Sequence, residues 1–196
     1  MYFCVINCIT MIFSNVLINW YLENKRDLPW RKTTNPYYIW LSEIILQQTR
    51  VDQGLAYYLK FVAHYPTIFD LSNAHEEEVL KLWQGLGYYS RARNLHFSAK
   101  YIVNELDGIF PTTYKEILKL KGVGDYTASA IASICFKEST AVVDGNVYRT
   151  LARFFDIGTP INSSKGIKYF KELAQKLIDV EDPATHNQAI MEFGAR

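Results

Sequence analysis

The stretch KLKGVGDYTASA, from Lys119 to Ala130, decides the fold, because two glycines here separate two segments with helical patterns. The first segment, residues 113–120, opens with the capping-box pattern Thr-Tyr-Lys-Glu, and the second covers residues 125–136. The glycines allow a tight turn and a close approach of the backbone to a ligand, and the second helix would offer free N–H groups to a phosphate. We therefore predict a helix–hairpin–helix, although a simple helix corner would show the same pattern.

A nucleotide-binding loop is disfavoured by what this stretch lacks. The dinucleotide fingerprint needs a third glycine after a strand, and the phosphate-binding loop of nucleoside triphosphatases needs Gly-Lys followed by Ser or Thr. Neither pattern occurs around Gly122-Val123-Gly124.

The rest of the chain has the pattern of an all-α protein. Cap-like residues open further helices at Asn35-Pro36, at Asn73 with Glu76, and at Asp182-Pro183. No Asn-Gly or Asp-Gly pair lies between two alternating runs, so β-hairpins are not indicated. We expect about ten helices and no sheet. The 196 residues suffice for one domain or for two small lobes that share a core.

Composition and charge limit the classes of function. The 21 Lys and Arg residues face 20 Asp and Glu residues, so the net charge is +1. Contact with a polyanion must therefore come from local placement of positive side chains. The three cysteines, Cys4, Cys8 and Cys135, form no Cys-x-x-Cys pair, which indicates a reducing compartment and favours the cytoplasm.

Both ends of the chain carry apolar helical patterns. The first twenty residues lack a basic start and a cleavage site, and asparagines interrupt them. We expect neither a signal peptide nor a membrane span there, but an amphipathic helix over residues 12–24. Met11 offers an alternative start, which would leave the first ten residues as an extension. The final NQAIMEFGAR stops inside an apolar-periodic helix without a C-cap, a pattern typical of truncation.

A single carboxylate interrupts the most apolar predicted helix. Residues 36–49, PYYIWLSEIILQQT, are apolar almost all round, and Glu43 lies in their middle. Its burial costs free energy unless the carboxyl group is paired, protonated or lining a cleft, and a buried protonated carboxyl group is suited to general acid catalysis. A structural glutamate paired with an arginine, or an exposed stripe, would give the same pattern.

A second acid stands before another helix. Asp144, in AVVDGNVYRT, precedes the helical NVYRTLARFF. As an N-cap it would stabilise that helix by about 1 kcal/mol, and capping alone would explain its presence. A helix N-terminus also keeps a carboxylate ionised. One protonated and one ionised carboxyl group is the division of labour that glycosidic cleavage requires.

Three long stretches of the chain carry motifs that agree with one another: LPWR with NPYYIWLSEIILQQTRV, LWQGLGYYSRARNL, and LKGVGDYTASAI with VVDGNVYR. Together they resemble the helix–hairpin–helix DNA glycosylase superfamily, and specifically the adenine DNA glycosylases of the MutY type, over residues 12–195. The resemblance implies a monofunctional enzyme of base excision repair. Such an enzyme flips adenine, mispaired with 8-oxoguanine or guanine, out of duplex DNA and hydrolyses its N-glycosidic bond. We expect a monomer with no membrane partner.

The resemblance also implies roles for single residues. Glu43 matches the acid that protonates N7 of adenine, and Asp144 matches the carboxylate that stabilises the oxocarbenium-like sugar through a transient covalent adduct. Tyr126 and Asn146 match supporting positions beside these acids. Gln188 matches a residue that reads adenine through its amide. The implied remainder of the pocket wall is Arg26, Leu28, Trp30, Arg31, Leu46 and Val51, of which Trp30 would equally suit a core.

Contacts with DNA and a two-lobed arrangement are implied as well. Gln48 and Tyr88 match residues that enter the duplex at the lesion, with Thr49 beside Gln48. Gly122, Val123 and Gly124 match a phosphate grip, to which hairpin carbonyls add a monovalent-ion site. The implied lobes are a six-helix barrel over residues 29–140, with its helix–hairpin–helix at about 113–136, and a second lobe of residues 1–28 plus 141–196. The base pocket is expected in the cleft between them.

The chain also departs from the family pattern. Full-length members continue after Gly194-Ala195 into four cysteines that hold a 4Fe–4S cluster, and then into a domain that recognises 8-oxoguanine. This chain ends at Arg196 without either, so the cluster is expected only of a full-length member. Lys121 stands where the family usually has proline. An endonuclease III-like glycosylase and lyase for damaged pyrimidines would need a lysine in place of Tyr126. A non-catalytic DNA-binding fragment is the other alternative.

Overall fold

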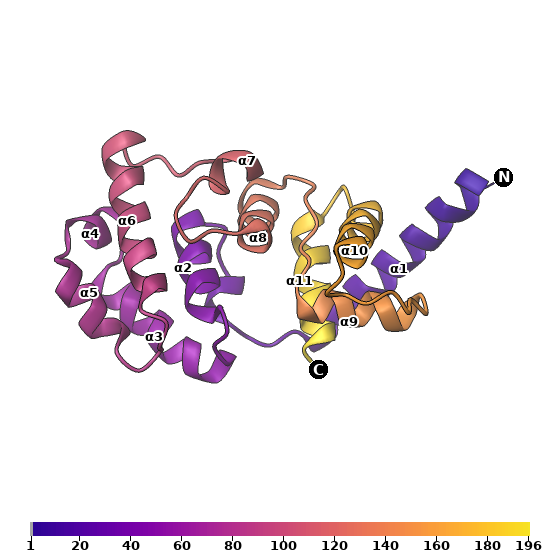
Figure 1. Ribbon diagram of the computed structural model, residues 1–196, viewed down its shortest axis with the longest axis horizontal. Coiled ribbons are helices and arrows are strands. Elements are labelled where there is room, and N and C mark those ends of the chain that lie inside the picture. The colour runs from indigo at the N-terminus through magenta and orange to yellow at the C-terminus, as the bar shows by residue number, and fades with distance from the viewer. Residues whose placement is uncertain (1) are drawn as a thin grey trace. The chain divides into compact units, whose positions relative to one another are not determined.

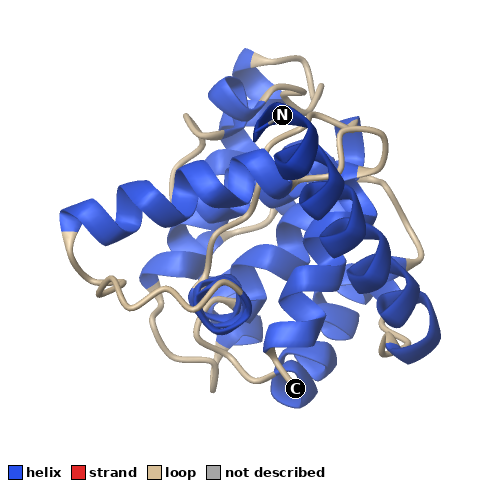
Figure 2. Ribbon diagram, turned by 90° about the vertical axis from the view of Figure 1, so that its right-hand side faces the viewer, coloured by secondary structure: helices blue, strands red, loops and turns tan. Residues whose placement is uncertain are grey.

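The computed structural model describes the backbone of residues 2–196 and the side chains of residues 12–196. Within that part of the chain every regular element is a helix, with eleven α-helices, one 3-10 helix and no strand (Figure 1; Figure 2). The predicted all-α class is confirmed. In chain order the elements are α1 (Tyr2–Asn24), η1 (Pro29–Arg31), α2 (Pro36–Leu46), α3 (Val51–His64), α4 (Ile68–Asn73), α5 (Glu76–Trp83), α6 (Ser90–Glu105), α7 (Tyr114–Ile117), α8 (Asp125–Phe136), α9 (Gly145–Phe154), α10 (Ser164–Leu177) and α11 (Pro183–Gly194).

Local capping residues set several of the helix starts. Asn35 accepts a hydrogen bond of 3.0 Å from the backbone N–H two residues on, at the start of α2. Asp182 caps α11 in the same way at 3.1 Å. Thr113 and Glu116 form the predicted capping box at α7. These helices begin where the sequence predicts, because each cap acts within three residues.

Other predicted boundaries are wrong. Asn73 ends α4 instead of opening the next helix, because His75 is the N-cap of α5. The helix predicted over residues 36–49 ends at Leu46, since the backbone of Gln48 takes a left-handed φ of 55°. The first helix of the hairpin is α-helical over residues 114–117 only, and the chain continues to Leu120 in tighter turns that bond to the third residue back.

Helix α1 includes the helix predicted over residues 12–24 and extends back to Tyr2. Phe13, Leu17 and Tyr21 on this helix are buried, whereas Val16 is exposed. The side chains of residues 1–11, with Met11 and the predicted extension before it, lie outside the described part. None of the helices in the described part combines the length and the apolar character that a membrane crossing requires.

Contacts within the chain define two compact units, the hairpin unit of residues 28–131 and the terminal unit of residues 1–27 with 132–196. The predicted lobes, by contrast, divide the chain at 28/29 and 140/141. The difference at the second boundary comes from α8, because its last turns pack within the terminal unit. There the amide of Asn187 donates a hydrogen bond of 2.9 Å to the hydroxyl of Ser133. Helix α8 therefore contributes residues to both units.

In the hairpin unit, α2 lies in the core. Its Trp40, Leu41 and Ile45 are fully buried, and both α3 and α6 pack against it. Phe61 of α3 and Trp83 of α5 meet edge to face, with ring centroids 5.7 Å apart. Burial on most faces holds α2 in one position, which fixes the backbone that carries Glu43.

In the terminal unit, α11 packs against helices that are distant from it in the sequence. It contacts α1 and α9, while α10 contacts α1 and α9 as well. Val147, Leu151, Phe170 and Ile190 supply the buried apolar side chains that join these helices. The start of α9, where Asp144 and Asn146 lie, is therefore built on a packed helical layer.

Candidate active site

Glu43 lies in the middle of α2, and only 9% of its surface is exposed. Its neighbours along the helix, Leu41, Ser42, Ile44 and Ile45, are buried too. The hydroxyl of Ser42 donates to the carbonyl of Ile39 at 2.7 Å and so stays within the helix. A carboxyl group in these surroundings is shielded from water, and the residues beside it along the helix hold it in place.

The loop after α2 carries Gln48 and Thr49. The side chain of Gln48 is exposed, whereas Thr49 is half-buried and donates through its hydroxyl to the carbonyl of Gln47 at 3.3 Å. The amide of Gln47 donates to the carbonyl of Gly122 at 3.5 Å and to the hydroxyl of Thr127 at 3.4 Å. The loop that carries Gln48 and Thr49 thus lies beside the glycine hairpin. The structure therefore brings together two segments that are both predicted to contact DNA.

The two hairpin glycines have different reasons for being glycine. Gly122 has a φ of 83°, and a Cβ atom there would lie 2.8 Å from Cβ of Asn94. Gly124 has neither constraint, because a Cβ atom there would meet nothing within 4 Å. Val123 between them is buried and anchors the turn, and its N–H donates to the carbonyl of Leu120 at 3.1 Å. The open backbone at Gly124, just before α8, can accept a phosphate.

The other predicted residues of the hairpin unit divide into core and partly exposed positions. Leu28 and Trp30 are 6% and 7% exposed, and the Trp30 ring meets Tyr58 edge to face at 5.1 Å. Trp30 therefore packs as a core residue from the short η1 helix. Tyr88 is 67% exposed. The half-buried positions are Tyr126 on α8, Arg31, Leu46 and Val51.

Asp144 is the N-cap of α9. Its Oδ1 atom accepts hydrogen bonds from the backbone N–H groups of Asn146 at 3.0 Å and Val147 at 2.9 Å. Its Oδ2 atom accepts from the side-chain amide of Asn146 at 2.9 Å. The predicted cap is confirmed, and Asn146 fixes the orientation of the carboxylate. The positive end of the helix dipole favours negative charge at this position.

Gln188, on α11, is held by a tyrosine of α1. The hydroxyl of Tyr21 donates to Oε1 of Gln188 at 2.6 Å, and Tyr21 itself is 3% exposed. This bond fixes which end of the amide faces the tyrosine, and it leaves the amide nitrogen as a donor for another group. An amide with a fixed orientation can distinguish a donor from an acceptor on a base edge.

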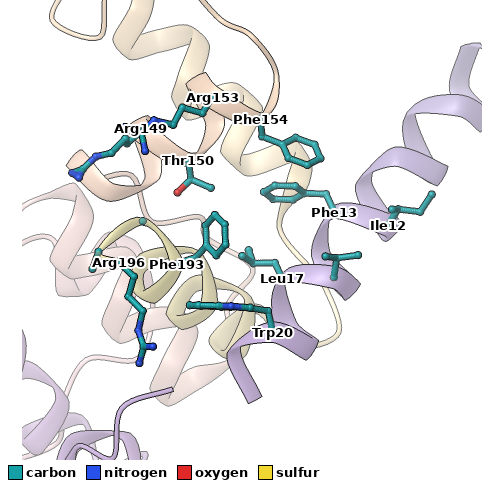
Figure 3. Close-up of a pocket in the computed structure, with 13 residues that line it drawn as sticks. Ile12, Phe13, Leu17, Trp20, Arg149, Thr150, Arg153, Phe154, Phe193 and Arg196 are labelled. Carbon is teal, nitrogen blue, oxygen red and sulfur yellow. The ribbon is translucent and has the colours of Figure 1, made fainter. Parts of the chain in front are cut away.

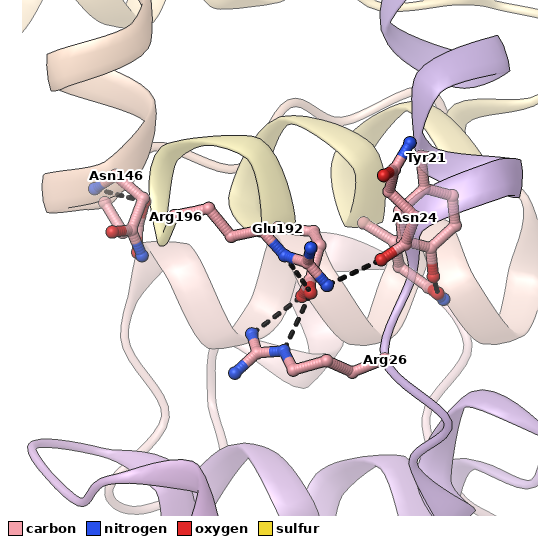
Figure 4. A network of polar contacts seen from close by, with 8 residues as sticks. Tyr21, Asn24, Arg26, Asn146, Glu192 and Arg196 are labelled. Carbon is pink, nitrogen blue, oxygen red and sulfur yellow. Dashed lines mark hydrogen bonds and ion pairs between the residues drawn. The ribbon is translucent and has the colours of Figure 1, made fainter.

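Arg26, predicted as part of the pocket wall, forms an ion pair with Glu192 (Figure 4). Its Nε and Nη2 atoms donate to the two carboxylate oxygens of Glu192, both at 2.7 Å. Arg196 approaches the same carboxylate at 3.5 Å and donates to the carbonyl of Asn24 at 2.7 Å. Glu192 is 1% exposed, whereas both arginine side chains are partly exposed, so a buried carboxylate with two partly exposed partners joins the ends of α1 and α11.

A cavity of about 760 Å³ lies in the terminal unit, and Arg196 is among the residues that line it (Figure 3). Aromatic rings of α1 and α11 form much of its wall, and Trp20 meets Phe193 edge to face at 5.0 Å. Arg149 and Arg153 of α9 border it. No predicted site residue lines this cavity within the described part, so its size does not identify the reacting centre.

The residues present do not fit a 4Fe–4S cluster. Such a cluster needs four cysteine thiolates, and the sequence contains three cysteines in total. Cys4 and Cys8 lie outside the described side chains, and Cys135 is half-buried. Within residues 12–196, moreover, no three His, Cys, Asp or Glu side chains gather as metal ligands would.

A family model described as "HhH-GPD superfamily base excision DNA repair protein" matches residues 41–176, which include Glu43, the hairpin and Asp144. The chain belongs to this superfamily.

Curated relatives of the superfamily resemble this chain over nearly its whole length. It is 46% identical over 192 residues to the adenine DNA glycosylase of Rattus norvegicus, and the aligned region covers 93% of this chain and 37% of that protein. It is 42% identical over 191 residues to the adenine DNA glycosylase of Buchnera aphidicola subsp. Baizongia pistaciae, with coverages of 95% and 53%. The chain thus spans only about a third to a half of the length of these relatives.

Solved structures of HhH-GPD type share the fold. A thermostable thymine-DNA glycosylase superposes with a TM-score of 0.87 at 31% identity, over 96% of this chain and 87% of that one. A non-covalent endonuclease III–DNA complex gives a TM-score of 0.75 at 21% identity, over 92% and 82% of the two chains. The fold of this HhH-GPD protein is therefore that of DNA glycosylases.

Sequence reasoning missed three residues of this HhH-GPD chain that hold predicted site residues in place. Tyr21 holds Gln188, Glu192 holds Arg26, and Arg91 joins the loop after α2 to the loop before α6. Glu192 had a usable signal, because it is an acid inside the apolar-periodic stretch AIMEFGA, as Glu43 is in its own helix. Tyr21 and Arg91 had none, since their partners are distant in the sequence.

Proposed function

We propose that this chain is an adenine DNA glycosylase, which hydrolyses the N-glycosidic bond of adenine mispaired with 8-oxoguanine or guanine in duplex DNA and does not cleave the strand. The observation that carries the proposal is Glu43, a carboxyl group only 9% exposed on an apolar helix. The 46% identity to a relative named adenine DNA glycosylase supports it. The partner is duplex DNA, bound by a monomer in the cytoplasm.

Glu43 is assigned the role of general acid. Adenine is a poor leaving group until a ring nitrogen is protonated, and N7 is the nitrogen assigned here. Because burial favours the neutral carboxyl group, Glu43 can carry the proton that it donates to the base. Loss of a general acid typically lowers a rate by about 10² to 10⁴.

Asp144 is assigned the stabilisation of the sugar. When the glycosidic bond breaks, positive charge develops on the sugar, and a fixed carboxylate stabilises that charge or adds to it covalently before water attacks. Three hydrogen bonds, all from Asn146 and Val147, hold the Asp144 carboxylate. A carboxylate that is already oriented needs no reorganisation during the reaction.

Tyr126 supports base removal without strand cleavage. A glycosylase that also cleaves the strand uses an amine, usually that of a lysine, to form a Schiff base with the sugar. At the second residue of α8 this chain has a half-buried phenol, which cannot form a Schiff base. Gln188, oriented by Tyr21, is assigned the reading of adenine.

The DNA contacts are assigned to the hairpin unit. Gln48 and Tyr88 enter the duplex beside the lesion, and their contacts offset the loss of base stacking. Gly122 and Gly124 bring backbone N–H groups close to a phosphate. A net charge of only +1 makes such local contacts necessary, because the chain has no broad positive field.

A single-turnover glycosylase assay tests the proposal. The chain, in excess, is mixed with duplex DNA that carries adenine opposite 8-oxoguanine, and alkali reveals abasic sites. Parallel duplexes carry a thymine–guanine mispair or an oxidised pyrimidine. Release of adenine alone, and strand breaks only after alkali, is the expected result. Strand breaks without alkali would favour the endonuclease III-like alternative, and duplex binding without base release would favour the non-catalytic alternative.

Two variants test the roles proposed for Glu43 and Asp144. Glu43→Gln should abolish base release while duplex binding, measured by fluorescence anisotropy, stays near that of the unchanged chain. Asp144→Asn keeps a good N-cap, because Asn and Asp cap about equally well, yet removes the charge. Loss of activity with an unchanged unfolding midpoint is therefore expected for Asp144→Asn. Full activity in either variant would overturn the role assigned to that acid.

A further inference from the structure

Arg91, near the start of α6, is a buried cation whose partners are uncharged oxygens. Only 9% of the residue is exposed. Its Nη1 atom donates to the carbonyls of Ile45 at 3.1 Å and Ile44 at 3.3 Å, to the hydroxyl of Thr49 at 3.3 Å, and closely to the carbonyl of Gln47. Its Nη2 atom donates to the carbonyls of Leu86 at 3.1 Å and Gly87 at 3.4 Å. The two branches of one guanidinium group thus bind two separate segments.

The first branch caps α2 from outside that helix. The carbonyls of Ile44 and Ile45 belong to the last turn, where no N–H of the helix itself is available and the helix dipole is negative. A cation here is favourable and stabilises the end of α2 at Leu46. Arginine suits this position because its planar fork directs donors in two directions, whereas a lysine offers a single point charge.

The second branch holds the loop before α6, which two aromatic side chains reinforce. The guanidinium carbon lies 5.1 Å from the ring centroid of Trp83 and 5.7 Å from that of Tyr88. The indole N–H of Trp83 donates to the carbonyl of Gly87 at 3.0 Å. The same carbonyl also accepts the hydrogen bond from Nη2 of Arg91.

Each segment presents one residue with a strained backbone. Gln48 has a φ of 55° and Tyr88 a φ of 45°, in the left-handed region that disfavours residues other than glycine. Both side chains are exposed, and Arg91 bonds to the residue directly before each of them, Gln47 and Gly87. Strain of this kind persists where surrounding contacts over-determine the backbone.

We propose that Arg91 is a positioning residue that holds Gln48 and Tyr88 together as one preformed wedge for entry into the duplex. The proposal rests on the proposed function, which assigns these two residues to the lesion. With both loops fixed in the free protein, binding does not have to order them, so more of the contact energy remains for extruding the base.

The test compares Arg91→Lys with a matched control, Arg93→Lys. Arg93 lies on the same helix, is exposed, and pairs with Glu76 at 3.6 Å. The substrate is a duplex with 2-aminopurine opposite 8-oxoguanine, because the fluorescence of 2-aminopurine rises when the base leaves the stack. The protein is added to saturation, so that the fluorescence reports base extrusion and not the fraction of DNA that is bound. Anisotropy measures the binding.

The expected result is a fluorescence rise reduced roughly tenfold in Arg91→Lys, at saturation and with helical circular dichroism retained, and an unchanged rise in Arg93→Lys. Equal fluorescence in Arg91→Lys and the unchanged chain would overturn the proposal. Should Arg91→Lys lose its helical signal, Thr49→Val removes one contact of the same guanidinium and should lower the fluorescence rise by a smaller factor. No change in Thr49→Val would then count against the proposal.

Hydrogen exchange of the free protein separates this proposal from the proposed function. In Arg91→Lys, the amides of residues 46–50 and of residues 85–89 should exchange faster together, while those of Arg93→Lys should not change. Faster exchange in only one segment would overturn the coupling of the two loops. If amide exchange becomes faster in both segments but the unchanged chain releases no adenine, the proposed function is wrong. The inference that Arg91 holds the two loops together then still stands.

Discussion

His186 on α11 makes the stability of the terminal unit depend on pH. The residue is 2% exposed, and its Nδ1 atom lies 2.9 Å from the hydroxyl of Ser14 on α1. Burial lowers the pKa of His186 to about 4, against the smaller opposing effect of Asp179 and Asp182. The folded protein therefore keeps this ring neutral at pH values where the unfolded chain protonates it.

Proton linkage gives the sign and the size of the change in the free energy of unfolding with pH. Between pH 6.5 and pH 4 the unfolded state binds a proton that the folded state does not, so the free energy of unfolding falls as the pH falls and levels off below the folded pKa. With an unfolded pKa of about 6.5 and a folded pKa of about 4, the loss is about 2 kcal/mol between pH 7 and pH 5. A loss of this size is a large part of the stability of a small domain.

Urea unfolding followed by circular dichroism at pH 7 and pH 5 measures this loss. His186→Asn removes the titrating group, so this variant should lose about 2 kcal/mol less than the unchanged chain over the same interval. His64→Asn, which changes an exposed histidine, is the control and should behave as the unchanged chain does. If the unchanged chain and His186→Asn lose the same free energy, the burial argument is refuted.

Two further predictions concern stability and the hairpin. Gly122→Ala should lower the free energy of unfolding by about 1–2 kcal/mol, because it adds Cβ at a positive φ and against Asn94, whereas Gly124→Ala should change it by less than about 0.5 kcal/mol. If Gly124→Ala nevertheless weakens duplex binding in an anisotropy titration, the backbone there approaches a phosphate; equal stability of the two variants would refute the hairpin geometry. Glu192→Gln should cost about 2 kcal/mol in urea unfolding, since the half-exposed Arg26 loses its buried partner, and an unchanged midpoint would show that the pair contributes nothing.

The parts of the fold that the sequence predicts are those set within a few residues. The cap at Asn35 and the box at Thr113 act over two or three positions, so their helices start as expected. The end of α2 lies three residues before the predicted one, and the guanidinium group that bonds to its last carbonyls belongs to Arg91, more than forty positions along the chain. Long-range contacts of this kind leave no periodic signal in a local window.

The same limit applies to the candidate site. The pattern of a single acidic residue in an apolar helix fits Glu43, and it fits Glu192 equally well. Glu192 proved to be the structural case, with Arg26 bonded to both carboxylate oxygens. The pattern therefore finds buried carboxyl groups but does not assign their chemistry, which depends on partners brought by folding. The resemblance supplied the distinction in favour of Glu43.

The two units differ in how synthesis of the chain allows them to form. The hairpin unit is one continuous segment, residues 28–131, and can fold while the ribosome is still adding residues. Helix α1 is made first, but its partners α9, α10 and α11 follow only after that whole segment, a delay on the order of ten seconds at usual translation rates. During that interval the apolar surface formed by Phe13, Leu17 and Tyr21 has no partner helix to cover it. The nascent chain therefore exposes the apolar face of α1 until α10 and α11 have been synthesised.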